Sequence, residues 1–403
     1  MDEWISAASQ LSWPLALVAS WMAGELAHRL TGVSRISVYG IAGFLVGNLA
    51  VKLQGPIDHS PFLLLADLGF GLILFELGYR INLRWLRANP WILATALAEA
   101  GATFAAVWFA AAGFGVSSLG CGLLGALAMA TSPAGLVRVL NEEGAGGQVS
   151  ERALHLSALN CVAAVFVFNL IVGVKVFQTS GDLLHAAGAS LLVLAASAIL
   201  GFVAGLLVPL WLRGMGRISG LGGSGGGQDA TLAFALAVLL LVAATHVLKL
   251  SPVLAALSFG LAARHRRSAL GVAQRNFGAL GDLLSVLLFV FAASIVSWDH
   301  VAEGLLLGAL LVLVRLLVKV GVCAAFARPS GVSVRKGALS GLALAPMGVF
   351  AVLMLEQTRR LGVDLSHGLA PLAAMALLLQ VLGPMITQRA LAWAHETRHE
   401  KGV

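Results

Sequence analysis

The chain has 403 residues and a formal net charge of +7, with 59% hydrophobic and only 11% charged residues. Its mean hydropathy is +0.91, a value that no soluble globular domain of this size shows. The composition therefore excludes a soluble enzyme or a soluble binding domain. It predicts an all-α polytopic membrane protein that forms a single transmembrane domain over 1–403.

Apolar stretches long enough to cross a bilayer recur along the whole chain. A spanning helix needs about 20 mostly apolar residues. On this criterion the sequence predicts about thirteen spans, the ninth of which is short, over residues 12–30, 36–53, 60–80, 89–112, 117–141, 150–177, 183–212, 229–248, 251–264, 276–297, 300–327, 334–358 and 366–390.

Lysine and arginine are distributed unevenly between the loops on the two sides of these spans. With the N-terminus outside, the cytoplasmic loops and the C-terminal tail carry nineteen basic residues and the outer side carries five. The positive-inside rule then predicts an outer N-terminus and a cytoplasmic C-terminus. Topology accounts for the net positive charge, so no nucleic-acid partner is predicted. The excess of arginine over lysine, 20 to six, together with abundant Ala, Leu and Gly, suggests a bacterial inner membrane.

The three cysteines give no sign of a metal site or a disulfide. Cys121, Cys161 and Cys323 all fall inside predicted spans, and their spacing matches no metal-binding pattern. We therefore expect no metal and no other cofactor.

Two parts of the chain suggest an internal organisation. Residues 214–228 are rich in glycine and serine, which predicts a flexible cytoplasmic linker. Residues 89–178 and 300–394 each contain three predicted spans, and in each set a proline interrupts the middle span, at Pro133 and Pro346. Paired broken helices in inverted repeats indicate a transport site at the membrane midplane. The alternative is that each proline only kinks its helix.

Several of these segments resemble the cation:proton antiporter superfamily, nearest its Kef-type and NapA-like sodium/hydrogen exchanger branch. The most specific is LADLGFGLILFELGYRINLRWLR in the third span. The segments ALAMATSPAGLVRVLNEEG at the first break and GLALAPMGVFAVLML at the second are also similar to that family. The resemblance covers nearly the whole chain. It implies about thirteen helices, a homodimer, and an ion site where the two broken helices cross.

Two positions depart from the pattern of that family. The pair after the first broken helix usually ends in an acidic residue, and here it reads Asn160-Cys161. The second break often reads Pro-Arg-Gly-Glu, and here Pro346 is followed by Met347, Gly348 and Val349. A midplane carboxylate can bind either a proton or a cation and so exchange the two. A thiol stays protonated near neutral pH and is a weak ligand for hard cations.

Uncharged groups around the breaks remain candidates for binding a cation. They are the side chains of Thr131, Ser132 and Asn160, with the carbonyl groups that the breaks at Pro133 and Pro346 set free. None of these groups can carry the exchanged proton.

Glu99 is the best candidate for a substitute carboxylate. It lies about ten residues into its span, hence roughly 15 Å along the helix and near mid-depth. A packing role as a paired or protonated residue is an equal alternative. Arg315 and Lys319 lie one turn apart inside the span 300–327, where charged groups are costly and usually functional or paired. For Lys319, snorkelling to the interface is the alternative.

Five other ionisable residues inside the spans have a structural interpretation. We expect structural roles for Asp67 and Glu76, and hydrogen bonds between helices rather than ion binding for Glu25 and Asp282. For His246 we expect a surface position rather than a pH sensor.

The resemblance favours a secondary transporter, not an enzyme, that exchanges Na+ or K+ for protons, with coupling altered by Cys161. The first alternative is a carrier of an anionic or organic solute on the same fold. Arg315, Lys319 and the helix N-termini at the breaks would attract such a solute. The second alternative is a sensor or partner subunit that transports nothing.

Overall fold

The computed structural model describes residues 2–54, 60–176, 183–218, 226–265, 277–360 and 370–398. These residues form helices, and no strand occurs among them. In chain order the helices are α1 (Asp2–Thr31), α2 (Arg35–Gln54), α3 (Ser60–Arg80), α4 (Leu83–Ala88), α5 (Pro90–Gly113), α6 (Ser118–Met129), α7 (Pro133–Glu142), α8 (Gln148–Val176), α9 (Leu183–Ile218), α10 (Gly226–Val247), α11 (Pro252–His265), α13 (Gly278–Ser294), α14 (Trp298–Ala325), α15 (Val334–Ala343), α16 (Gly348–Arg360) and α17 (Ala370–Trp393).

Each predicted span corresponds to one helix or to one broken pair of helices. The spans 117–141 and 334–358 are the broken pairs, α6 with α7 and α15 with α16. Among the described residues, seven helices are long and apolar enough to cross a membrane, or eight if α15 and α16 count as one bent span. The all-α membrane fold is thus confirmed, and about thirteen spans are compatible with it.

The glycine-rich linker coincides only in part with the described residues. Helix α9 continues to Ile218 and α10 begins at Gly226, so both ends of the segment 214–228 are helical. Residues 219–225 lie outside the described part of the chain, and for them the linker remains a prediction.

The chain divides into two compact units, which are described separately. Unit 1 comprises 1–66, 88–164 and 286–403, and unit 2 comprises 67–87 and 165–285. Unit 1 contains both broken helices and most of the predicted repeats 89–178 and 300–394.

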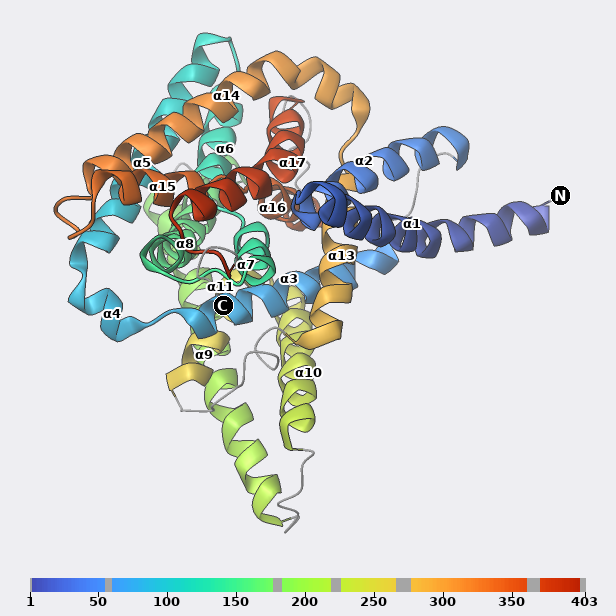
Figure 1. Ribbon diagram of the computed structural model, residues 1–403, viewed down its shortest axis with the longest axis horizontal. Helices are drawn as coiled ribbons and strands as arrows, with labels where there is room; N and C mark the ends of the chain where they lie inside the picture. The colour runs from blue at the N-terminus through green and yellow to red at the C-terminus, as the bar shows by residue number, and fades with distance from the viewer. Residues whose placement is uncertain are drawn as a thin grey trace. The chain divides into compact units, whose positions relative to one another are not determined.

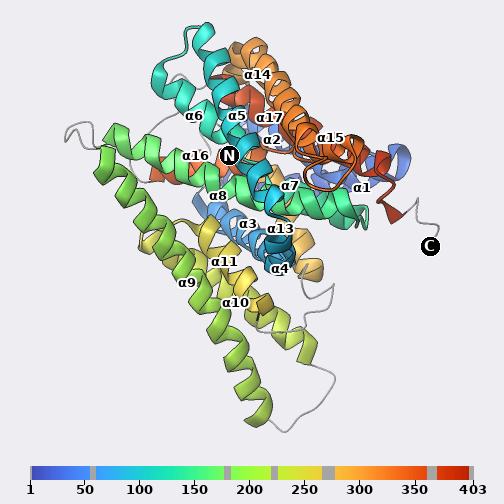
Figure 2. The ribbon, with the colours of Figure 1, turned by 90° about the vertical axis from the view of Figure 1, so that its left-hand side faces the viewer.

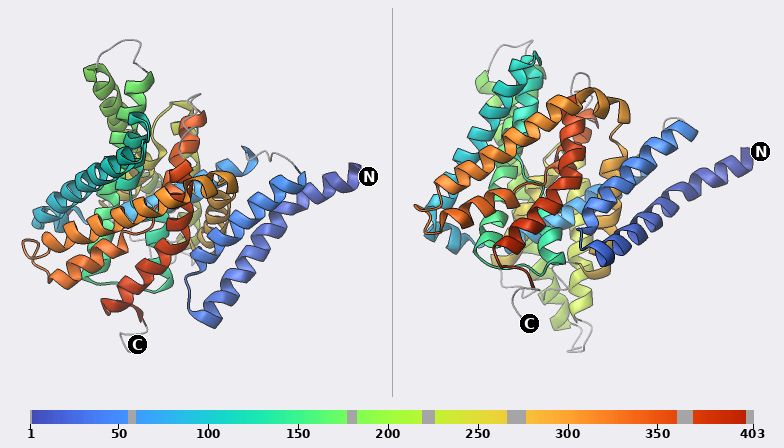
Figure 3. Two further views of the ribbon diagram at one scale, coloured as in Figure 1. Left: turned by 90° about the horizontal axis from the view of Figure 1, so that it is seen from above. Right: turned by 45° about the horizontal axis from the view of Figure 1, so that its top comes forward.

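In unit 1, α14 lies against α5, α15 and α17 (Figure 1). Glycines on α14 allow the close approach to α17, since a Cβ added at Gly308 would lie 2.6 Å from the Cβ of Ala374. Helices α1 and α2 pack against each other as a pair, blue in both views of Figure 3. These contacts place α5 and α14, which carry Glu99 and Lys319, side by side.

In unit 2, α9, α10 and α11 pack on one another (Figure 2). Phe75 of α3 lies at the centre of an aromatic cluster with Phe234, Phe259 and Phe277, and its ring centroid is 4.8 Å from that of Phe259. Aromatic pairs at such separations add to the free energy gained by apolar burial.

The C-terminal segment caps the start of α8, the helix that carries Asn160. The carboxylate of Glu396 accepts hydrogen bonds from the backbone N–H groups of Val149 and Ser150, both at 2.8 Å, and from the Ser150 hydroxyl at 2.7 Å. A carboxylate at this position satisfies N–H groups that have no partner within the helix, and it complements the helix dipole.

Glu396→Ala should therefore loosen the first turn of α8. Loss of a helix cap costs about 1–2 kcal/mol, so amide hydrogen exchange of Val149 and Ser150 should accelerate by about 10-fold. Glu303→Ala, at an exposed acid on α14, is the control and should leave these amides unchanged. Equal exchange rates in the two variants would show that the carboxylate does not hold the helix end.

Candidate ion-binding site

The two helix breaks lie against each other in unit 1. Helix α6 ends at Met129 and α7 begins at Pro133, while α15 ends at Ala343 and α16 begins at Gly348. The backbone N–H of Ser132 donates to the carbonyl of Pro346 at 2.7 Å, and the Thr131 hydroxyl donates to the carbonyl of Leu344 at 3.2 Å. The breaks that the prolines predicted therefore meet and hydrogen-bond directly.

A glycine makes this crossing possible. A Cβ added at Gly135 would lie 2.7 Å from the Cβ of Pro346, closer than real Cβ atoms come. The Ser132 hydroxyl also accepts a hydrogen bond from the Gly135 N–H at 3.4 Å and so caps the start of α7. Thr131 and Ser132 thus stabilise the crossing itself.

Arg315 of α14 fills the space between the two breaks. Its guanidinium is fully buried and donates four hydrogen bonds of 2.8–3.1 Å, to the carbonyls of Ala128, Ala130, Leu344 and Ala345. These groups terminate α6 and α15, where carbonyls lack partners within the helix and carry partial negative charge. Carbonyls that the sequence suggested for an incoming cation thus already accept hydrogen bonds from a cationic side chain.

Glu99 lies next to this crossing and is fully buried. One carboxylate oxygen, Oε1, lies 2.5 Å from Lys319 Nζ and accepts a hydrogen bond from the Thr103 hydroxyl at 3.0 Å. The other, Oε2, accepts from Asn160 Nδ2 at 2.5 Å. Three helices, α5, α8 and α14, thus bring an acid, an amide and a base into direct contact.

Lys319 is also fully buried, and its ammonium group donates a second hydrogen bond to the carbonyl of Met129 at 3.1 Å. Snorkelling therefore does not describe this side chain. A buried ion pair is favourable only when its remaining hydrogen-bonding groups find partners. Here the Met129 carbonyl and the Thr103 hydroxyl provide them.

Asn160 keeps one polar atom without a partner. Its side-chain oxygen Oδ1 is buried and accepts no hydrogen bond. Such atoms are rare in folded proteins, since an unpaired buried acceptor costs about 1–3 kcal/mol. An unpaired amide oxygen beside the Glu99 carboxylate is the type of ligand that hard cations prefer.

The Cys161 side chain contacts the first helix break and brings no carboxylate to the site. Its buried thiol donates to the carbonyl of Thr131 at 3.1 Å, and the Ser157 hydroxyl, one turn earlier on α8, approaches the same carbonyl at 3.4 Å. The thiol therefore supports the first break. Gly348 begins α16, where a Cβ would collide with the α17 backbone at Ala376, so its small size serves packing.

One contact residue of the site was not foreseen from the sequence. Thr103 follows Glu99 by four residues on α5, so both lie on the same helix face and their side chains can meet. The four-residue spacing between Glu99 and Thr103 was therefore the one sequence feature that could have predicted this contact.

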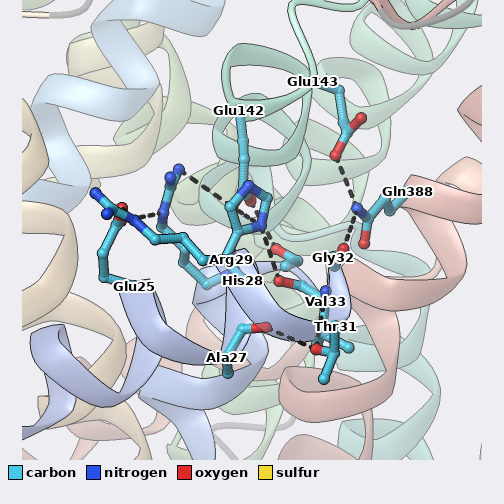
Figure 4. Close-up of polar contacts among 12 residues, drawn as sticks. Glu25, Ala27, His28, Arg29, Thr31, Gly32, Val33, Glu142, Glu143 and Gln388 are labelled. Atoms are coloured by element: carbon cyan, nitrogen blue, oxygen red, sulfur yellow. Dashed lines mark hydrogen bonds and ion pairs between the residues drawn. The ribbon is translucent and has the colours of Figure 1, made fainter.

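The other ionisable residues form pairs away from the crossing. Glu25 accepts hydrogen bonds from Arg29 at 2.7 Å and from Arg35 at 2.8 Å, within the polar cluster that Figure 4 shows. Glu76 pairs with Arg80 at 2.6 Å.

His246 is partly exposed and lies 3.0 Å from the nearly buried carboxylate of Asp67 in unit 2. The sequence pointed to a surface position for this histidine and did not predict its acidic partner.

Comparison with known proteins agrees with this architecture. A family model described as "Sodium/hydrogen exchanger, transmembrane" matches residues 15–393. The fold is similar to that of the sodium proton antiporter MjNhaP1 from Methanocaldococcus jannaschii, with a TM-score of 0.66 and 16% sequence identity over 97% of each chain. No curated protein matches the chain in sequence. Because the family match extends over nearly its whole length, the chain belongs to the transmembrane sodium/hydrogen exchanger family.

Proposed function

We propose that the chain is a secondary transporter that exchanges Na+ or K+ for protons, and that Glu99 and Lys319 carry the exchange in place of an acid at position 161. The observation that carries this proposal is the buried contact of Glu99 with Lys319 and Asn160 beside the crossed breaks. It supplies the titratable group that Cys161 cannot provide.

The contacts suggest how one cation would replace one proton. An incoming cation would bind the Glu99 carboxylate and the unpaired Oδ1 of Asn160. The Lys319 ammonium would then lose its counter-charge and release a proton, because an uncompensated buried charge is strongly unfavourable. The charge of the site would be the same before and after, so we expect one proton for each monovalent cation.

A carrier for anionic solutes receives less support. Arg315, one of the two cations expected to attract an anion, already donates to four carbonyl groups. Lys319 in turn is paired with Glu99.

The test is a flux measurement with purified protein in liposomes that contain a pH-sensitive dye. Addition of Na+, K+ or Li+ salts should move protons in the wild-type protein, at rates that depend on the cation and not on the anion. A response that follows the anion would favour the solute carrier. No response to any salt would favour a sensor or partner subunit.

Cys161→Asp tests whether Glu99 has taken over the role of the acid that is missing at position 161. In the proposed mechanism the wild-type protein is active, and an added carboxylate would face the Thr131 carbonyl, with which it cannot hydrogen-bond when ionised. The variant should therefore transport no faster than wild type in the same dye assay, with Cys161→Ser as the uncharged control. Activity in Cys161→Asp alone would contradict the role of Glu99 and assign the exchange to position 161.

The membrane, the orientation and the assembly are also proposals. The distribution of Lys and Arg supports an outer N-terminus and a cytoplasmic C-terminus, in a bacterial inner membrane. The resemblance to the antiporter superfamily supports a homodimer.

A further inference from the structure

The loop that joins α1 to α2 is held by one residue from each of the predicted repeats. Glu142 is the last residue of α7, the second half of the first broken helix, and Gln388 lies on α17, the helix after the second. Both side chains contact residues 32–35 (Figure 4). We call these contacts the loop latch, and in the proposed orientation they lie on the cytoplasmic side.

Glu142 makes most of the latch contacts. Its side chain is 7% exposed, and its oxygen Oε2 accepts a hydrogen bond from the Ser34 hydroxyl at 2.9 Å. Oε1 accepts from the backbone N–H of Arg35 at 3.2 Å and from the guanidinium of the same residue at 3.4 Å. His28 Nδ1 lies 3.3 Å from Oε1. A carboxylate of α7 thus satisfies an N–H group in the first turn of α2 that has no partner within that helix.

Gln388 holds the other end of the same loop. Its side-chain nitrogen Nε2 donates to the Gly32 carbonyl at 2.8 Å and to Glu143 Oε1 at 2.8 Å. One side chain therefore joins the loop to α17 and to the residue that follows α7. Together, Glu142 and Gln388 tie α1 and α2 to both repeats.

The latch bonds are accessible to water, and those of the helix crossing are not. The side chains of His28 and Arg35 are 26% and 34% exposed, and Gly32 is exposed. Water can therefore replace the latch bonds when they break, with little loss of hydrogen bonding. The Arg315 guanidinium is fully buried, so its carbonyl partners would find no such replacement. The latch is thus a contact that can open and re-form repeatedly.

Helix α2 itself is packed closely against α13. A Cβ added at Gly43 would collide with the α13 backbone at Val290, so the two helices touch directly. Toward α17, α2 contributes a hydroxyl group, since Ser37 donates to the Val381 carbonyl at 2.6 Å. A hydroxyl can rotate to another acceptor, whereas a contact between two backbones fixes both helices. We therefore expect a displacement of the helix crossing to leave α2 on α13 and to separate it from α7 and α17.

We propose that the loop latch must open in every transport cycle, and that Glu142 and Gln388 are the residues that leave the loop. A displacement that changes access to Glu99 would withdraw both side chains from residues 32–35. The latch rests on the proposed exchange at Glu99, but neither latch residue binds the cation. Because a closed latch holds the protein in one conformation, permanent closure should stop transport.

The test closes the latch with a covalent bridge. Ser34→Cys with Glu142→Cys is reconstituted in liposomes that contain the pH-sensitive dye, and a short, membrane-permeant bifunctional methanethiosulfonate reagent joins the two thiols. The mass of the intact protein verifies the bridge. Proton movement on addition of Na+ should be lost after bridging and should return when dithiothreitol reduces the bridge.

The matched control bridges two helices that both bond to the crossing. The Lys336 Nζ atom of α15 donates to Gln148 Oε1 of α8 at 2.8 Å, and α8 bonds to the first break through Cys161. Gln148→Cys with Lys336→Cys, joined by the same reagent, should keep its exchange rate. The single variants Ser34→Cys and Glu142→Cys should be unaffected by the reagent, because the native cysteines are buried.

Exchange by the bridged latch at the rate of the unbridged variant would overturn the proposal. If the double variant is inactive before bridging, Ser34→Cys alone provides the second measurement. Its position is buried, so an impermeant maleimide should label the thiol faster during Na+-driven exchange than without Na+; equal labelling rates would overturn the proposal too. A wild-type protein that moves no protons with any cation would refute the proposed exchange, and the latch with it, before any reagent is added.

Discussion

Glu99→Gln is expected to abolish cation-dependent proton movement in liposomes, with an initial rate lower by about 100-fold or more. The substitution keeps the size of the side chain and removes the negative charge that pairs with Lys319. In the proposed mechanism this carboxylate also binds the cation. Loss of a contact to a charged group costs about 1.5–3 kcal/mol, and about 1.4 kcal/mol corresponds to a factor of ten in rate. The measurement is the dye assay described above, with Na+ and K+ tested separately.

Two further variants make this result specific. Glu303→Gln removes an exposed acid from α14, so it should transport at the wild-type rate. Glu99→Asp keeps the charge on a shorter side chain and should retain part of the activity. If Glu99→Gln transports as well as Glu303→Gln does, the exchanged proton is carried by another group and the proposed mechanism is wrong.

Arg315→Met is expected to cause the largest loss of stability. The methionine has a similar length and no donors, so four buried carbonyl groups at the ends of α6 and α15 would lose their partner. Unpaired buried acceptors cost about 1–3 kcal/mol each, and partial relaxation reduces the sum. We expect a loss of about 3–5 kcal/mol, which corresponds to a Tm lower by about 5–10 °C.

Thermal unfolding in detergent measures this effect, with Arg87→Met as the matched control at an exposed site. Arg315→Lys should fall between the two, because an ammonium group has only three donors and cannot match the planar guanidinium. A Tm for Arg315→Met equal to that of Arg87→Met would show that the carbonyls find other partners.

The sequence predicted the helices well because their signals are local. Apolar stretches of sufficient length define the spans, and Pro133 and Pro346 mark the two breaks. The depth of Glu99 along its helix was also readable, since it depends only on the rise per residue.

Contacts between distant segments could not be read in this way. The bond from Arg315 to the carbonyl of Ala130 joins residues 185 positions apart, and whether an arginine or an incoming cation occupies that carbonyl depends on how α14 packs. The pairing of His246 with Asp67 likewise depends on the packing of α10 against α3. In both cases the sequence pointed to the residue, but its partner became visible only in the structure.

The position of Arg315 has a consequence for how the protein can move. One rigid, planar group is bonded to the last carbonyls of two different helices, and the Ser132 N–H is bonded to Pro346 beside it. A displacement of either break alone would break these hydrogen bonds, and the membrane interior offers the freed groups no water to bond instead. The two interrupted helices therefore behave mechanically as a single part, and any shift that changes access to Glu99 must carry both of them together.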